Sequence, residues 1–191
     1  MDRPVLFVNA CVRKESRTEL LAVKLLERIN RPFDEVCLRS ITFPVVNEDF
    51  LNKRDRHISA RDFDSPLFDL AKQFSQAEVI VIAAPYWDLS FPAALKQYFE
   101  QVNVPGISFE YTGEGIPIGL CKADKLFYVT TAGGCNVQNE YGFGYVTALA
   151  KIYYGIRDVE LIEADGLDIY GADVEARLKS AEAAILNLEI G

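Results

Sequence analysis

Five short apolar runs, separated by stretches with helical periodicity, constrain the fold of this chain more than any other feature. The runs are rich in branched and aromatic side chains and span residues 5–10, 35–40, 79–84, 126–131 and 159–164. The first, third and fourth are apolar at nearly every position, which is typical of parallel strands buried on both faces. The second and fifth alternate more, so we expect them nearer the edges of a sheet.

Apolar residues recur every three or four positions in residues 18–29, 65–77, 92–102, 145–156 and 173–190. This spacing predicts five amphipathic helices. Strands alternating with helices predict a parallel α/β sheet with helices on both faces, a three-layer arrangement. With five strands, we expect the flavodoxin-like order 2-1-3-4-5. The composition does not change along the chain, so residues 1–191 are predicted to form one domain.

The connection at residues 44–64 is polar, charge-rich and contains His57, the single histidine of the chain. A solvated surface loop is the interpretation we favour for it, with a lid or a partner contact as alternatives. Because His57 has no cysteine, carboxylate pair or second histidine at ligand spacing, we expect no metal site.

The charge and the cysteines bear on partners and location. A formal net charge of −8, spread along the chain, argues against nucleic acid and against an anionic membrane surface. No apolar run approaches the roughly 20 residues that span a bilayer, and the first residues do not resemble a signal peptide. Four cysteines without a C-x-x-C pair fit a reducing compartment. We therefore expect a cytoplasmic protein with no nucleic-acid or membrane partner.

Ligands bind to sheets of this order beyond the carboxyl ends of the strands, which directs attention to three loops. In the loop after the first strand, Ser16-Arg17-Thr18-Glu19 matches the S-x-x-E capping box that opens a helix. A capped helix needs no ligand. The same N–H groups, with two hydroxyls and a guanidinium, also form an anion site, and at this position we favour phosphate binding.

The loop after the third strand contains Pro85, which ends the strand, and then Tyr86, Trp87, Asp88 and Leu89. Two adjacent aromatic side chains either pack against a helix or a subunit, or form the wall of a site for a planar ring. Because this loop accompanies two others at the same edge of the sheet, we favour the site.

The loop after the fourth strand contains Thr131, Ala132, Gly133 and Gly134. Paired glycines allow a positive φ in a simple loop, or they allow the backbone to approach a ligand closely. Alone, this pair does not distinguish the two.

With these loops in view, the chain resembles the flavodoxin-like NAD(P)H dehydrogenase (quinone) family, which includes FMN-dependent azoreductases. The resemblance covers most of the chain and is most specific in "VIVIAAPYWDLSFPAALKQYF". That segment is similar to the family's apolar strand, Ala-Pro, aromatic or Met, Tyr, Asn, Phe and Pro-x-x-Leu-Lys. Two further segments are similar to the family's approach to the Gly-Gly loop and to its last strand: "GISFEYTGEGIPIGLCKADKLFYVTTAGG" and "YGIRDVELIEADGLDIYG".

The resemblance implies an oxidoreductase with non-covalent FMN. NADH or NADPH would supply two electrons as hydride through flavin N5, and a quinone or a similar azo or nitro acceptor would receive them. It also implies a homodimer whose partner chain helps to enclose each flavin. No side chain is assigned a catalytic role, because the chemistry belongs to FMN. The residues that the resemblance assigns are Cys11, Ser16, Arg17 and Thr18 at the phosphate; Pro85, Tyr86, Trp87, Asp88 and Leu89 at one ring edge; Thr131, Ala132, Gly133 and Gly134 at another; and Tyr111 and Tyr141 beside the substrate.

Two positions depart from the family pattern. Cys11 stands where serine is typical and Asp88 where asparagine is usual; a thiol is a poor donor to phosphate, and a carboxylate cannot donate as an amide does. Two alternatives therefore stay open. One is a flavodoxin-type electron carrier, although the chain lacks the T-x-T-G-x-T pattern of that group. The other is a flavin-free binding or regulatory protein with the same fold.

Overall fold

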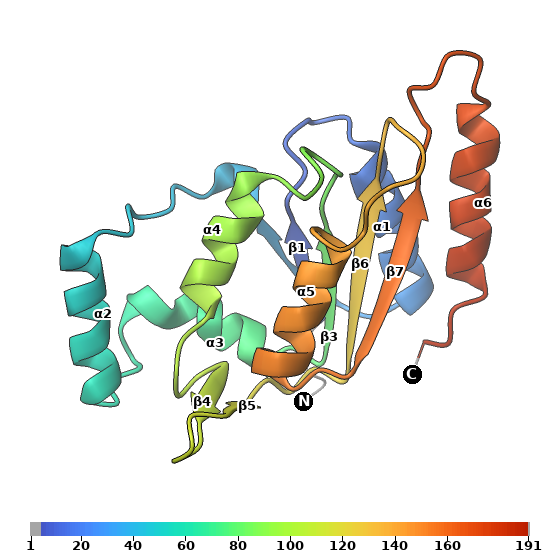
Figure 1. The fold of residues 1–191 in the computed structure, drawn as a ribbon. Coiled ribbons are helices and arrows are strands. Elements are labelled where there is room, and N and C mark those ends of the chain that lie inside the picture. Colours follow the sequence, from blue (N-terminus) through green and yellow to red (C-terminus); the bar gives the residue numbers. More distant parts are fainter. Residues whose placement is uncertain (1–4, 191) are drawn as a thin grey trace.

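The computed structural model describes residues 5–190 and contains a five-stranded parallel sheet with helices on both faces (Figure 1). The spatial order of the strands, β2-β1-β3-β6-β7, is the predicted order 2-1-3-4-5, with the two more polar strands at the edges. The flavodoxin-like fold is therefore confirmed. The strands are β1 (Val5–Asn9), β2 (Phe33–Cys37), β3 (Val79–Ala83), β6 (Lys125–Thr131) and β7 (Asp158–Ala164).

Alternate residues of each central strand face two separate hydrophobic cores, as the two-residue repeat of a strand requires. In β3, Ile80 and Ile82 belong to one core, whereas Val79 and Val81 belong to the other. The first core is covered by α3 (Asp69–Gln76), α4 (Ala93–Val102) and α5 (Phe143–Leu149), and the second by α1 (Arg17–Ile29) and α6 (Val174–Leu186).

Two predicted elements are wrong at one end. Residues 38–40 do not extend β2 but form the 3₁₀ helix η1 (Leu38–Ser40), a turn in which the Leu38 side chain is buried in the first core. Residues 66–68, predicted as the start of a helix, form the 3₁₀ helix η2 (Pro66–Phe68). Ser65 caps it, and α3 begins only at Asp69.

The last two predicted helices also differ from the structure. The helix predicted over residues 145–156 begins at Phe143 and changes after Leu149 into a π-helical turn, η3 (Ala150–Tyr154), which ends at Gly155 with φ 77°. A positive φ at this position favours glycine and stops the helix. The helix predicted over residues 173–190 ends at Leu186 instead of continuing to residue 190.

The prediction of a solvated loop at residues 44–64 is wrong, because this segment contains helix α2 (Glu48–Ser59). The Asn47 side chain caps the helix by accepting a hydrogen bond from the Phe50 N–H at 2.9 Å. None of the α2 residues is buried, so the segment lacks the apolar repeat by which a helix is recognised in sequence. The helix projects from the β2 side of the sheet (Figure 1).

A short antiparallel hairpin was also not predicted from the sequence; its strands are β4 (Phe109–Tyr111) and β5 (Pro117–Gly119). It lies at the end of the molecule opposite the carboxyl ends of the parallel strands (Figure 1). The hairpin packs on η3 through Phe109 and Tyr153, whose ring centroids are 4.6 Å apart.

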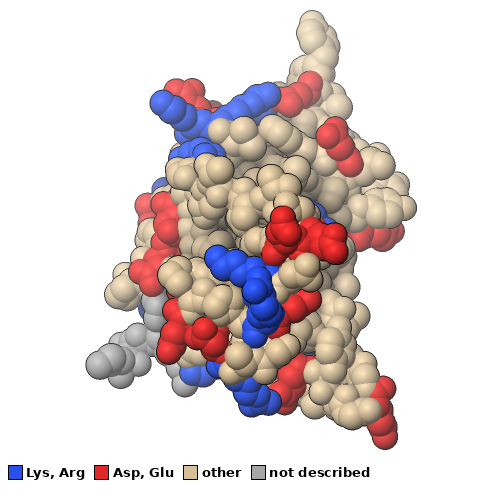
Figure 2. Space-filling model, turned by 90° about the vertical axis from the view of Figure 1, so that its left-hand side faces the viewer, with Lys and Arg blue, Asp and Glu red and all other residues tan. Residues whose placement is uncertain are grey.

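Lysine and arginine side chains are interspersed with aspartate and glutamate on the face shown in Figure 2. Within residues 5–190, no helix has the length and hydropathy to cross a bilayer. In the same part of the chain, no three His, Cys, Asp or Glu side chains are grouped so that they could hold a metal ion.

Candidate functional site

A cleft of about 380 Å³ opens at the carboxyl ends of the central strands. This volume lies within the range of small-molecule and cofactor sites. The chain leaves β1 toward one face of the sheet and β3 toward the other, so the cleft occupies the position where open parallel sheets bind ligands. Its lining comes from the loops after β1, β3, β6 and β7: Val12, Arg13, Glu15, Ser16, Arg17, Thr18, Pro85, Tyr86, Trp87, Thr131, Ala132, Gly133, Leu167 and Asp168.

The first turn of α1 forms one end of the cleft. Ser16 caps this helix, and its hydroxyl oxygen accepts a hydrogen bond from the Glu19 N–H at 3.3 Å. Thr18 lies with its hydroxyl oxygen 2.7 Å from that of Thr131, which ties the helix to the end of β6. The first N–H groups of a helix have no partner within it and carry partial positive charge. The N–H groups and hydroxyls together make this end of the cleft suited to an anion.

Arg17 adds a full positive charge to the same end. Its Nη1 atom lies 2.9 Å from Asp168 Oδ1 and 3.4 Å from the Leu167 carbonyl oxygen. Both charged side chains are partly exposed, 44% for Arg17 and 71% for Asp168. Exposed ion pairs contribute little free energy, so Arg17 can exchange this partner for an incoming anion at small cost.

The turn after β3 has an unusual backbone. Trp87 and Ser90 exchange two N–H to carbonyl bonds, of 3.1 and 2.7 Å, around Asp88 and Leu89. Those two residues have φ values of 50° and 68°. Positive φ at both central positions is the pattern of a two-residue type I′ turn, which favours Asn-Gly or Asp-Gly. Aspartate tolerates the first position, whereas a leucine at the second position is strained.

The loops after β6 and β7 stay paired beyond the ends of their strands. Leu167 and Asp168 donate N–H bonds to the carbonyls of Ala132 and Gly133, at 3.1 and 3.0 Å. A Cβ on Gly133 would collide with the Asp168 carboxylate. Neither Gly133 nor Gly134 has a positive φ. The absent side chain at residue 133 therefore makes room for Asp168, and the paired glycines do not serve a left-handed turn.

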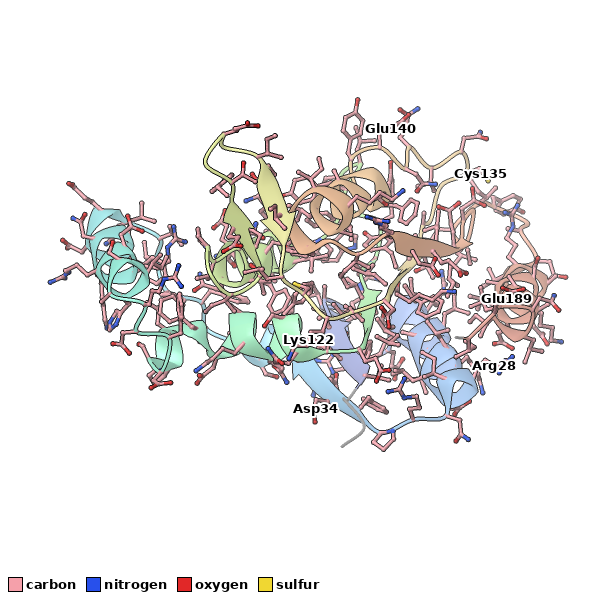
Figure 3. All side chains as sticks on the ribbon, turned by 90° about the horizontal axis from the view of Figure 1, so that it is seen from below. Arg28, Asp34, Lys122, Cys135, Glu140 and Glu189 are labelled. Atoms are coloured by element: carbon pink, nitrogen blue, oxygen red, sulfur yellow. The ribbon has the colours of Figure 1, made fainter. Side chains whose placement is uncertain are left out.

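The loop after β6 is fastened to the turn after β3. The Gln138 N–H donates to the Tyr86 hydroxyl oxygen at 3.4 Å, and the Ser90 hydroxyl donates to the Tyr141 carbonyl at 2.7 Å. In Figure 3, Cys135 and Glu140 mark this loop beside α5. The two bonds join two walls of the cleft into one unit, with the Tyr141 side chain 59% exposed outside the lining.

The structure brings together in the cleft most of the residues to which the resemblance assigns FMN: Ser16, Arg17, Thr18, Pro85, Tyr86, Trp87, Thr131, Ala132 and Gly133. Asp88, Leu89 and Gly134 lie beside it but not in its lining.

Cys11 does not line the cleft. It is fully buried in the second core, with its sulfur 3.9 Å from the Ala83 carbonyl oxygen. Burial raises the pKa of the thiol to about 11. The expectation that this side chain contacts phosphate assumed that a residue early in the loop points outward. In the structure, this part of the loop still packs its side chain into the second core.

Tyr111 also lies away from the cleft, on the hairpin at the other end of the sheet (Figure 1). The hydrogen bond between its hydroxyl and that of Tyr153 raises the pKa of Tyr111. The side chain is 52% exposed.

Five lining residues were not predicted from the sequence: Val12, Arg13, Glu15, Leu167 and Asp168. The last two follow β7, a strand predicted at the edge. Since β7 neighbours β6 in the predicted order, its position beside β6 was the signal in the sequence that pointed to the loop after it.

Fold and cleft together define a flavodoxin-like protein with a cofactor-sized site at the switch point of its sheet. A family model described as a flavodoxin-like fold matches residues 3–188, and the chain belongs to this family.

Named relatives cover nearly the whole chain. An FMN-dependent NADH:quinone oxidoreductase from Clostridium perfringens is 34% identical over 96% of this chain and 96% of its own. A protein of the same name from Lachnoclostridium phytofermentans is 35% identical over 93% of each chain. Among solved structures, an FMN-dependent NADH-azoreductase from Bacillus anthracis in complex with FMN has a TM-score of 0.81 and covers 96% of each chain. It is 20% identical, so this likeness bears on the fold alone.

Proposed function

We propose that the protein is an FMN-dependent NADH:quinone oxidoreductase that also accepts related compounds such as azo dyes. The observation that carries the proposal is the donor set at the first turn of α1, which opens into a cofactor-sized cleft. The two named relatives, each covering more than nine-tenths of the chain, support the same activity.

The residues of the cleft fit FMN. Hydroxyls of Ser16 and Thr18, the guanidinium of Arg17 and the N–H groups of α1 are all donors, as a phosphate monoester requires. Tyr86 and Trp87 supply flat apolar surface for the ring. When bound, FMN supplies two-electron transfer between a nicotinamide and an acceptor.

Residues of the protein stabilise charge on the ring and exclude water from the cleft. We assign the backbone N–H groups of Gly133 and Gly134 to the polar edge of the ring, where donors stabilise negative charge. Tyr86 and Trp87 exclude water from one side of the cleft. The Asp88 side chain contributes no hydrogen-bond donor, so we assign the contact between this turn and the ring to the backbone of the turn.

We further propose a homodimer in which Tyr111 reaches the cleft of the partner. Within one chain the hairpin lies at the end of the sheet opposite the loops that line the cleft (Figure 1). Large apolar side chains are exposed at or beside the cleft (Trp87, Leu89 and Tyr141), on the hairpin (Tyr111, Ile116 and Ile118) and on η3 (Ile152). Exposed apolar groups of this kind mark interaction surfaces. Light scattering of Ile118→Glu should report a monomer, and Leu20→Glu, at an exposed position on α1, should stay dimeric. A monomeric parent protein would contradict the proposal.

We place the protein in the cytoplasm and treat it as one domain. All four cysteines are free, which supports a reducing compartment. The family match over residues 3–188 supports a single domain. Thiol titration after native purification should give four reduced thiols, and unfolding in urea should give one cooperative transition.

Binding is the first test of the proposed function. Flavin fluorescence should be quenched on titration with the protein, and FMN should bind at least about 100-fold more tightly than riboflavin, which lacks the phosphate. Equal affinity for the two flavins would remove the role of the α1 donor set.

Turnover is the second test. NADH added without oxygen should bleach the bound flavin, and a benzoquinone should restore its colour. Flavin that binds but resists both NADH and NADPH would indicate an electron carrier instead, and absence of flavin binding would indicate a flavin-free protein.

A further inference from the structure

A network of polar side chains lies next to the first turn of α1, outside the lining of the cleft. At its centre is Asn9, the last residue of β1, which is fully buried. Its amide nitrogen donates to Glu19 Oε1 and to Glu35 Oε1, both at 2.9 Å. Its carbonyl oxygen accepts the Cys11 N–H at 3.0 Å. Every polar atom of the Asn9 side chain is thus used, which fixes the side chain in one orientation.

Arg39, in η1, completes this network from outside the cleft. Its Nη1 atom donates to the Cys11 carbonyl oxygen and to Glu19 Oε2, each at 3.2 Å. The first acceptor is in the loop after β1, and the second is in the first turn of α1. One nitrogen therefore bridges the two segments that form the anion-binding end of the cleft.

The charges explain why a cation is needed at this place. Glu19 and Glu35 share the amide group of one residue, so two carboxylates lie close together. The hydrogen bond to Glu19 raises the pKa of Arg39, and Glu35 adds to the effect, so the guanidinium is firmly charged. Arg39 offsets the repulsion between the two carboxylates while it holds the loop.

We propose that Arg39 is a positioning residue for the anion-binding loop, acting through Cys11 and Glu19 and without contact with the ligand. It is not among the residues that line the cleft. This inference rests on the proposed function for the identity of the ligand, but its structural part concerns the loop itself. Without Arg39, the loop keeps its link to α1 through Asn9, but it loses the second link, which runs from the Cys11 carbonyl through the guanidinium to Glu19.

Ligand affinity gives the first test, with FMN as the probe in a fluorescence titration. Arg39→Gln should weaken FMN binding about tenfold, because the loop must then be ordered when the ligand binds. Arg39→Lys should recover most of the affinity, since both bonds come from one nitrogen and an ammonium group can also make two. Arg31→Gln is the matched control: this arginine pairs with Glu78 at 2.6 Å, far from the cleft, and is similarly exposed. Its FMN affinity should match the parent protein.

Hydrogen exchange in the flavin-free protein gives a readout that does not depend on the function. The Cys11 amide should exchange about tenfold faster in Arg39→Gln than in the parent protein, and at the parent rate in Arg31→Gln. Unchanged exchange in Arg39→Gln, or an equal loss of FMN affinity in Arg31→Gln, overturns the proposal. Failure of Arg39→Lys to recover any affinity also overturns it, because a contact specific to the guanidinium would then be required. If the parent protein binds no FMN, the proposed function fails, and exchange still decides the role of Arg39.

Discussion

Arg17 and Asp168 are 151 positions apart in the sequence and form an ion pair of 2.9 Å across the mouth of the cleft. The arginine belongs to the first turn of α1, and the aspartate follows β7. The guanidinium that we propose for phosphate binding thus pairs with a carboxylate of the loop after β7. The Asp168 carboxylate and an incoming phosphate would compete for the same guanidinium, so we expect substitutions of Arg17 and of Asp168 to have opposite effects on binding.

Removing the arginine should weaken FMN binding, and removing the charge of the aspartate should not. We expect Arg17→Met to raise the Kd for FMN about tenfold or more, through loss of a charge-assisted hydrogen bond to phosphate. Asp168→Asn should lower the Kd severalfold, because it frees Arg17 and removes a negative charge from the mouth of the cleft.

Flavin fluorescence titration measures both changes. Lys24→Met and Glu27→Gln are suitable controls, since they remove a 3.3 Å ion pair on the exposed side of the same helix and should leave the Kd unchanged. If Asp168→Asn weakens binding as strongly as Arg17→Met, then Asp168 orients the arginine and does not compete for it.

Leu89 should reduce the stability of the fold. Its φ of 68° is strained for a residue with a Cβ, and its side chain is 56% exposed. Leu89→Gly should raise the free energy of unfolding by about 1 kcal/mol, whereas Leu89→Ala should bring no gain because the strain remains. Urea unfolding measures the difference. Leu20→Gly, at a similarly exposed leucine within α1, should lower stability by about 1 kcal/mol.

The buried thiol of Cys11 predicts a loss of stability at high pH. Burial raises its pKa to about 11, so the folded state keeps the proton to a higher pH than the unfolded state does. The resulting stabilisation is complete below pH 9 and is lost as the pH rises through 11. Between pH 8 and pH 10.5, Cys11→Ala should therefore lose about 2 kcal/mol less stability than the parent protein. Urea unfolding at the two pH values measures this.

Cys135 provides the control for that comparison, because its thiol is exposed. Cys135→Ala should lose as much stability with pH as the parent protein. Identical pH profiles for Cys11→Ala and the parent protein would show that the Cys11 thiol ionises normally in the folded state.

Gly119 should not tolerate a side chain. A Cβ there would overlap the backbone of Tyr154 and Gly155, where η3 ends. Gly119→Ala should thus displace the hairpin from η3 and lower the free energy of unfolding by about 2 kcal/mol. Gly113→Ala, in the loop of the same hairpin with no atom near the new Cβ, should leave stability unchanged. Thermal unfolding compares the two, and equal effects would mean that the hairpin is mobile enough to adapt.

The sheet and its order could be predicted because the central strands are buried on both faces, and their sequences are therefore apolar at nearly every position. Helix α2 could not, because a helix without a buried residue has no apolar repeat. The hairpin was too short to be recognised among turn residues.

The candidate site was predictable as a set of loops, but the direction of each side chain was not. Cys11 and Ser16 lie in one loop, yet the first faces the core and the second faces the cleft. The pairing of Arg17 with Asp168 depends on how the loops after β6 and β7 continue beyond their strands, which no local pattern encodes.

The strands do not end at one level. Asn9, Ala83 and Val129 are neighbours across the sheet, and β1 and β3 end there, whereas β6 and β7 continue to Thr131 and Ala164. The chain after β3 nevertheless stays beside β6 along these two residues, because the Ala84 and Tyr86 N–H groups donate to the Val129 and Thr131 carbonyls at 2.9 and 3.0 Å, so the two segments form one continuous wall of the cleft. A planar ligand that packs against this wall exposes only one of its faces to other molecules. Two substrates that both need that face must bind one after the other, and the first must dissociate before the second can bind.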